Sequence, residues 1–215
     1  TDLYVSPDET AARFFTIGFE QSGTFQIQDP EMQSYASALF PRSTIAHDGI
    51  LMPQSFLGLP FIYGLMTFFL GPSVLTFLTP LLFLLATLAW RKVLQQFLSP
   101  KIADLATLVL LVHPAFWYYS ARGLMHNVLF VSLLIFAAFF YFAKPLTRHL
   151  EICKKRFGPK QKWQADVDPF LGGLMLGLAL FVRTSEVYWV VLMIGLLFLM
   201  MRKAIVWHRV VLFAF

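Results

Sequence analysis

The sequence predicts an all-α fold: a polytopic transmembrane helical bundle with an amphipathic helix in an extracytoplasmic loop. Hydrophobic residues fill 58% of the 215 positions and charged residues only 13%, whereas soluble domains carry roughly 45–50% and 25%. Apolar runs of nearly spanning length recur along the chain, and basic residues gather in alternate connectors between them. This pattern excludes a soluble globular domain and a disordered chain. We also expect no nucleic-acid partner, because the excess of 17 Lys and Arg over 12 acids lies in the connectors.

Residues 1–54 are expected to form a polar extracytoplasmic loop that precedes the apolar runs. They contain seven of the twelve acids and only two cations, Arg13 and Arg42. Ser6 as N-cap, Pro7 in the first turn and Glu9 three residues after the cap make a capping box, and Gly23 can end the helix. The pattern predicts a helix over about residues 7–22.

Residues 55–215 are predicted to form the transmembrane region. The expected helices cover about residues 55–70, 73–90, 102–119, 127–143, 169–182 and 187–201, with residues 204–215 starting a further span. The first is only roughly 24 Å long as a helix, against a hydrocarbon core of about 30 Å. Because it also contains Gly58, Pro60 and Gly64, we expect a short, kinked or partly inserted helix.

The cations predict the orientation of these helices. Connectors 91–101, 144–168 and 202–203 hold most of the Lys and Arg residues, whereas the alternate connectors hold only Arg122 and Arg183. The basic set is therefore expected to be cytoplasmic, and residues 120–127 and 183–186 to face outside. Residues 1–54 lie on the same outer side if the short first helix does not fully cross the membrane. Because both ends look cut, we interpret the chain as a fragment lacking the first span and the C-terminal part.

The first helix carries the first candidate site residues. At 100° per residue, Glu9, Arg13, Thr16 and Glu20 fall in a polar stripe, whereas Asp8 falls in the apolar stripe of Ala11, Ala12, Phe15 and Phe19. Asp8 either stabilises the helix dipole or, held against apolar surroundings, accepts a proton from a substrate. Glu9 is either the reciprocal half of the capping box or a second catalytic carboxylate.

The outer connectors supply the other candidates. YYSARGLMHN contains Arg122, His126 and Asn127, and VRTSEV contains Arg183 and Glu186. Arg122 either anchors a helix end at the interface or binds an anion. Arg183 either pairs with Glu186 or binds an anionic head group. His47, Asp48 and Gly49 indicate a turn first and a site second.

Four segments occur in an order that resembles the GT-C glycosyltransferases: SPDETAARFF, SFLGLPFIYGL, YSARGLMHN and GGLMLGLALFVRTS. The likeness is greatest to the branch containing the dolichyl-phosphate-mannose protein mannosyltransferases and the lipid A aminoarabinose transferases. It covers nearly the whole chain in order, although each motif is short.

This resemblance implies a GT-C-like bundle in the bacterial inner membrane or an equivalent membrane, with its active site on the extracytoplasmic face. The implied enzyme transfers a sugar with inversion from a polyprenyl-phosphate donor to a hydroxyl of a lipid, protein or polysaccharide acceptor. Asp8 would be the general base beside Glu9, with Arg122, Arg183 and Arg42 near the donor phosphate. Arg42 would stand in for a family Lys that MPQSFLGLP lacks.

The resemblance implies no certain cofactor and leaves open whether the enzyme uses a divalent metal. The family often carries a second acid where this chain has His126. That departure removes a carboxylate, although an imidazole can also ligate a metal.

A transporter or flippase component for lipid-linked glycans is the alternative, because several apolar segments are interrupted by Gly and Pro. A structural membrane subunit is the third hypothesis. Polar residues gather in one outer region rather than at mid-membrane, which favours the enzyme.

Overall fold

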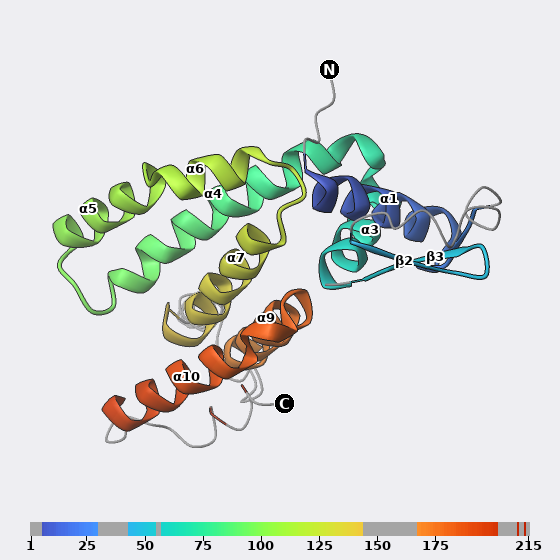
Figure 1. The fold of residues 1–215 in the computed structure, drawn as a ribbon. Coiled ribbons are helices and arrows are strands. Elements are labelled where there is room, and N and C mark those ends of the chain that lie inside the picture. Colours follow the sequence, from blue (N-terminus) through green and yellow to red (C-terminus); the bar gives the residue numbers. More distant parts are fainter. Residues whose placement is uncertain are drawn as a thin grey trace, which may run out of the picture. The chain divides into compact units, whose positions relative to one another are not determined.

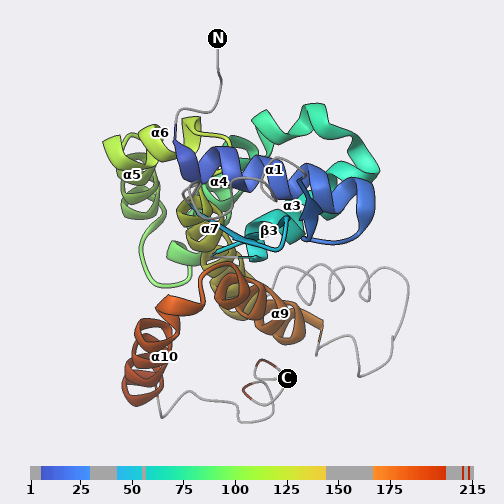
Figure 2. The same ribbon diagram turned by 45° about the vertical axis from the view of Figure 1, so that its right-hand side comes forward.

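The computed structural model describes residues 6–29, 43–54, 57–143, 167–201, 210 and 213. The protein is mostly helical, with three short strands near its N-terminus (Figures 1 and 2). It divides into two compact units, Thr1–Phe83 with Pro114–Leu129 and Leu84–His113 with Phe130–Phe215. Each unit is described by itself.

The first unit begins with helix α1, Pro7–Ser22, which has the bounds that its caps predict. The Asp8 amide donates to Ser6 Oγ at 3.2 Å, and the Ser6 amide donates to Glu9 Oε2 at 3.1 Å. At the other end, Gly23 adopts a φ of 70°, and its amide donates to the Phe19 carbonyl. The predicted capping box and glycine cap are therefore confirmed.

A small antiparallel sheet follows α1, in the order β1–β3–β2. Its strands are β1 (Ile27–Gln28), β2 (Thr44–His47) and β3 (Ile50–Pro53). His47 pairs with Ile50 across a two-residue turn in which Asp48 and Gly49 have φ values of 49° and 75°. Positive φ at both positions is typical of a type I′ hairpin turn. The turn predicted at these residues is confirmed, whereas the composition gave no sign of the strands.

Helix α3, Gly58–Leu70, packs closely against α1. The two helices lie side by side in both ribbon views (Figures 1 and 2). Phe15, Leu59 and Tyr63 are almost completely buried, and the rings of Phe19 and Phe61 lie 5.4 Å apart. Gly64 allows the close approach, because a β-carbon there would lie 2.7 Å from Phe19 Cδ1 and 3.3 Å from the Thr16 carbonyl oxygen.

The rest of the first unit includes a short 3-10 turn η1 (Pro72–Val74), the beginning of α4 (Leu75–Leu94), α6 (Pro114–Ala121) and the start of α7 (His126–Ala138). A buried polar chain connects these elements to α3. Tyr63 Oη lies 2.8 Å from Thr79 Oγ1, and Thr79 donates to the Gly123 carbonyl. The loop between α6 and α7 is thus fixed to both α3 and α4.

The second unit contains the end of α4, α5 (Pro100–Leu111), the π-helical turn η2 (Phe139–Ala143), α9 (Val167–Val182), the 3-10 turn η4 (Thr184–Glu186) and α10 (Val187–Met201). Arg91 Nε donates to Asp104 Oδ1 at 2.6 Å, joining α4 to α5. Gly172 lies close to the Ala137 carbonyl oxygen, where a β-carbon would be 3.2 Å away.

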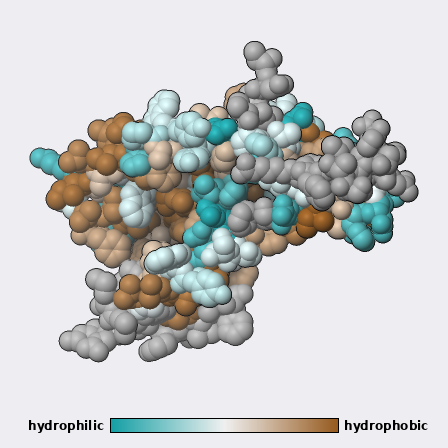
Figure 3. Space-filling view, viewed as in Figure 1, coloured by the Kyte–Doolittle hydropathy of each residue, from teal (hydrophilic) through white to brown (hydrophobic). Residues whose placement is uncertain are grey.

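Several helices are long and apolar enough to span a membrane. Pro72–Leu94 and His126–Ala143 each qualify, and the number of candidate spans rises from two to four if each of two bent helix pairs is one span. Large apolar side chains such as Phe77, Leu88 and Leu105 are exposed on these helices. Figure 3 shows hydrophobic residues gathered over the region of α4 and α5. These properties are compatible with a membrane protein.

One predicted run differs from the described helices. The run 102–119 is divided at Val112 and His113, where α5 and α6 meet at 54°. Pro114 explains this break, because proline lacks the amide that would continue the helix and disfavours helical geometry in the preceding residue. The short first helix agrees with the 13 residues of α3. The predicted start of a further span, 204–215, lies outside the described residues except for 210 and 213.

We predict that Gly64→Val destabilises the packing of α1 on α3. The added carbons must displace Phe19 or the α1 backbone, and overpacking of this kind costs about 1–3 kcal/mol. Thermal unfolding in detergent measures the loss. Gly177→Val is the matched control, because a β-carbon at Gly177 meets nothing within 4 Å. Equal melting temperatures for the two variants would contradict this account of the contact.

Candidate functional site

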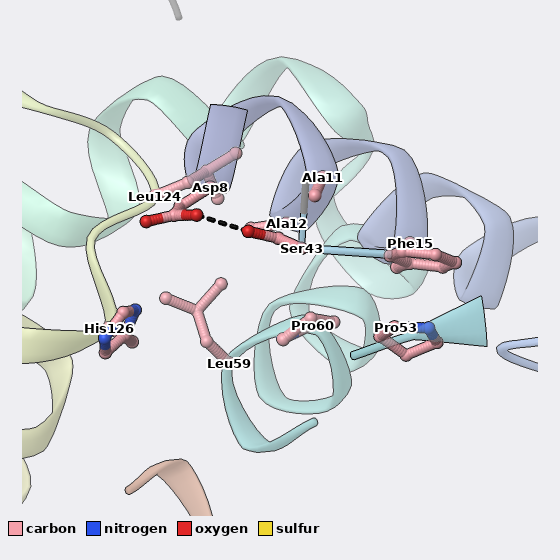
Figure 4. A pocket seen from close by; sticks show the side chains of 10 residues that line it. All are labelled: Asp8, Ala11, Ala12, Phe15, Ser43, Pro53, Leu59, Pro60, Leu124 and His126. Carbon is pink, nitrogen blue, oxygen red and sulfur yellow. Dashed lines mark hydrogen bonds between the residues drawn. The ribbon is translucent and has the colours of Figure 1, made fainter. Parts of the chain in front are cut away.

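A cavity of about 90 Å³ lies beside the first turns of α1 (Figure 4). Its polar side chains are Asp8 from α1, Ser43 directly before β2 and His126 at the start of α7. The remaining walls are apolar and come from α1, β3, α3 and the loop before α7. They include Ala12, Phe15, Pro53, Leu59, Pro60 and Leu124. The pocket therefore gathers three polar groups from distant parts of the sequence in an apolar setting.

Asp8 is half-buried and lines this pocket together with Ala11, Ala12 and Phe15. The helical wheel predicted that these four residues share a face, and the structure confirms that placement. The Ser43 hydroxyl donates a hydrogen bond to Asp8 Oδ1. Figure 4 shows the second carboxylate oxygen of Asp8 pointing away from Ser43.

Glu9 has a different environment from its neighbour. It is only 1% exposed, and its Oε2 atom accepts from the Ser6 amide at 3.1 Å and lies 3.0 Å from Arg122 Nη2. Thr16, another member of the predicted polar stripe, is also completely buried. The predicted polar stripe is therefore buried against the protein at Glu9 and Thr16. Glu9 is not among the residues that line the pocket. Its contacts favour the capping alternative, extended by an ion pair.

Arg122 is the partner that Glu9 requires. A buried carboxylate loses the hydration that stabilises its charge, and a nearby guanidinium offsets part of that loss. The Arg122 side chain is 22% exposed. Its Nη1 donates to Tyr118 Oη at 2.9 Å, and the guanidinium carbon lies 5.3 Å from the centre of the Tyr118 ring. These contacts favour an anchoring role for Arg122.

The loop between α6 and α7 places His126. The ion pair holds this loop at Arg122, Thr79 holds it at the Gly123 carbonyl, and Leu124 is 2% exposed. His126 follows at the beginning of α7, half-buried in the wall of the pocket that contains Asp8. An imidazole thus lines the same pocket as Asp8, at the position where the resemblance implies a second acid.

The other two predicted phosphate-binding residues are Arg183 and Arg42. Arg183 belongs to the second unit, where its Nη2 lies 2.8 Å from Glu186 Oε1. That distance shows the Arg183–Glu186 pairing that the sequence left as one alternative. Arg42 lies outside the described residues.

The pocket does not offer a complete metal site. Asp8 and His126 supply two ligand types, whereas a bound divalent ion usually has at least three protein ligands or several carboxylates. Across the described part of the chain, no group of three His, Cys, Asp or Glu residues gathers to hold a metal ion.

Ser43 is the site residue that sequence reasoning missed. It directly precedes the unpredicted strand β2 and contacts Asp8, 35 positions earlier in the sequence. A serine beside polar and small residues carries no local signal of such a contact. Sequence reasoning could have found this contact only by predicting strand β2 and its packing against the first helix.

No family model matches this sequence, and searches of curated proteins and of solved structures find no matching protein. The likeness to the GT-C glycosyltransferases therefore rests on the four segments quoted above.

We predict that Glu9→Gln destabilises the protein by about 3 kcal/mol, because it leaves the Arg122 charge without its buried partner. Equilibrium unfolding in detergent measures this loss. The control is Asp104→Asn, which breaks the Arg91–Asp104 pair, whose side chains are 39% and 50% exposed. We expect little change there, because exposed pairs contribute little to stability. Similar losses in both variants would show that burial does not set the strength of the Glu9–Arg122 pair.

Proposed function

We propose that the chain belongs to a membrane glycosyltransferase. The enzyme transfers a sugar from a polyprenyl-phosphate donor to an extracytoplasmic acceptor hydroxyl with inversion. The observation that carries this proposal is the Asp8 carboxylate, which lines a small, mostly apolar pocket in a protein with helices of membrane-spanning length. The order of the four GT-C-like segments supports the same reaction class.

Asp8 is suited to act as general base in such a transfer. The acceptor oxygen forms a bond to the anomeric carbon while the bond from that carbon to the phosphate oxygen breaks. The hydroxyl proton passes to Asp8, and the electron pair of the broken bond leaves with the polyprenyl phosphate. A positioned base typically contributes a factor of about 10²–10⁴ to such a step. Ser43 binds one carboxylate oxygen of Asp8, which leaves the other for the acceptor hydroxyl.

The size of the pocket fits the acceptor end of the reaction. A volume of about 90 Å³ is small, since a cavity of about 150 Å³ holds a benzene molecule. It admits the reacting hydroxyl and the atoms next to it, whereas a lipid-linked sugar is far larger. The donor would therefore approach from the mouth of the pocket, with its polyprenyl chain in the membrane.

The donor phosphate gains charge as it leaves, and basic side chains stabilise that charge. Arg122, Arg183 and Arg42 remain the proposed phosphate-binding residues. Arg122 and Arg183 each contact an acid, so they would bind phosphate through N–H groups outside those pairs. A guanidinium has five such donors, which makes shared recognition of a carboxylate and a phosphate chemically reasonable.

One observation favours the second candidate, a transporter or flippase component for lipid-linked glycans. Two apolar helix pairs are bent by 54° and 111°, and interrupted helices are common where transporters bind their substrates. Proteoliposomes distinguish the two functions. Movement of a lipid-linked sugar across the bilayer without transfer would identify the transporter.

We predict that Asp8→Asn lowers sugar transfer at least about 100-fold, because the amide cannot accept the hydroxyl proton. The assay uses the protein in membranes with a panel of radiolabelled polyprenyl-phosphate sugars, and it measures label transferred or hydrolysed. Asp48→Asn is the matched control. It makes the same chemical change at a side chain that is 86% exposed, in a turn where asparagine is favourable.

Near-normal transfer by Asp8→Asn would contradict the role of Asp8 while leaving the reaction class intact. If wild type consumes no donor in the panel, the glycosyltransferase proposal itself is wrong.

A further inference from the structure

We propose that Ser43 is a positioning residue that orients the Asp8 carboxylate for proton transfer. The inference rests on the proposed function, because it assigns Ser43 a role in the same reaction. It is carried by two independent observations, the backbone conformation of Ser43 and its hydrogen bond to Asp8.

The backbone of Ser43 lies in the left-handed region, with a φ of 65°. Among described residues other than glycine, Asp48 alone shares a positive φ, and the type I′ turn explains that case. Ser43 instead stands beside β2, where its carbonyl accepts from the Gln54 amide at 3.1 Å. Glycine adopts this conformation without steric cost, whereas a side chain does not. A serine here is therefore explained by what its hydroxyl contributes.

The Ser43 hydroxyl contributes a contact with the pocket's carboxylate. It donates to Asp8 Oδ1, and both residues line the cavity. Figure 4 shows the two side chains pointing toward one another, one from α1 and one from directly before β2. Strained backbone conformations are often found at functional sites, where the surrounding structure enforces them.

This hydrogen bond has a geometric consequence for catalysis. A carboxylate turns readily about its last side-chain torsion, and one anchored oxygen fixes its plane. With Oδ1 held by Ser43, Oδ2 keeps a constant direction for an acceptor hydroxyl. Because the single hydroxyl proton of Ser43 is donated to Asp8, Ser43 acts through Asp8 and does not itself react.

Two substitutions separate this role from a structural one. Ser43→Gly suits the left-handed backbone and removes the donor. Ser43→Asn also tolerates that backbone and offers an amide N–H in place of the hydroxyl. We expect Ser43→Gly to lower kcat by about tenfold or more, because misplaced reacting groups slow catalysis by up to about 100-fold. We expect its KM for the polyprenyl-phosphate sugar to stay unchanged and Ser43→Asn to recover most of kcat.

The hydrogen bond itself is tested without any activity. Melting temperatures in detergent are measured for the full chain, Asp8→Ala, Ser43→Gly and the double variant. A bond between the two side chains predicts non-additive effects, with Ser43→Gly costing more when Asp8 is present. Glycine also relieves the strained backbone at position 43. This effect is the same with Asp8 and in the Asp8→Ala background, so it cancels when the two are compared.

The outcomes distinguish this inference from the proposed function. Additive melting temperatures would overturn the positioning role, whatever the activity. Coupled melting temperatures with wild-type kcat in Ser43→Gly would also overturn it. Coupled melting temperatures in a protein that uses no donor would instead overturn the proposed function. The bond would then stand, but the role of Ser43 in that reaction would fall.

Discussion

The buried ion pair between Glu9 and Arg122 is the contact on which the site depends. It joins the first helix to the loop between α6 and α7, two segments that are far apart in the sequence. A carboxylate that is 1% exposed is strongly unfavourable without a partner, so the loop must present Arg122 for α1 to pack as it does. The Thr79 hydrogen bond to Gly123 holds the next residue. Together the two contacts bring Leu124 and His126 into the wall of the pocket that contains Asp8.

Adjacent acids in α1 have separate tasks because successive helical residues point about 100° apart. Glu9 turns into the protein, where it caps the helix and binds Arg122. Asp8 turns into the pocket, where one oxygen contacts Ser43. Glu9 thus stabilises the structure, whereas Asp8 lines the pocket and is the base of the proposed transfer.

Local signals predicted the local structure well. Ser6, Glu9 and Gly23 are sufficient to fix the bounds of α1, because caps act on neighbouring backbone groups. Asp48 and Gly49 likewise specify their turn. The Glu9–Arg122, Ser43–Asp8 and Thr79–Gly123 contacts could not be predicted, since each depends on how distant segments pack. The distribution of cations singled out Arg122, because the outer connectors hold few basic residues. It could not show that Arg122 forms an ion pair with Glu9. The sugar-transfer function rests on motif order and on Asp8, and it remains a proposal.

The most direct test of the account is chemical labelling of the pocket in intact cells. The protein carries Ala12→Cys, a pocket position, in a Cys153→Ser background. A small membrane-impermeant methanethiosulfonate is applied from outside. The account predicts labelling of Cys at position 12 without opening the membrane, and protection when a polyprenyl-phosphate sugar that the enzyme uses is present. Labelling only after the membrane is opened would contradict an extracytoplasmic position of the pocket. Labelling that no donor slows would contradict a transferase site beside Asp8.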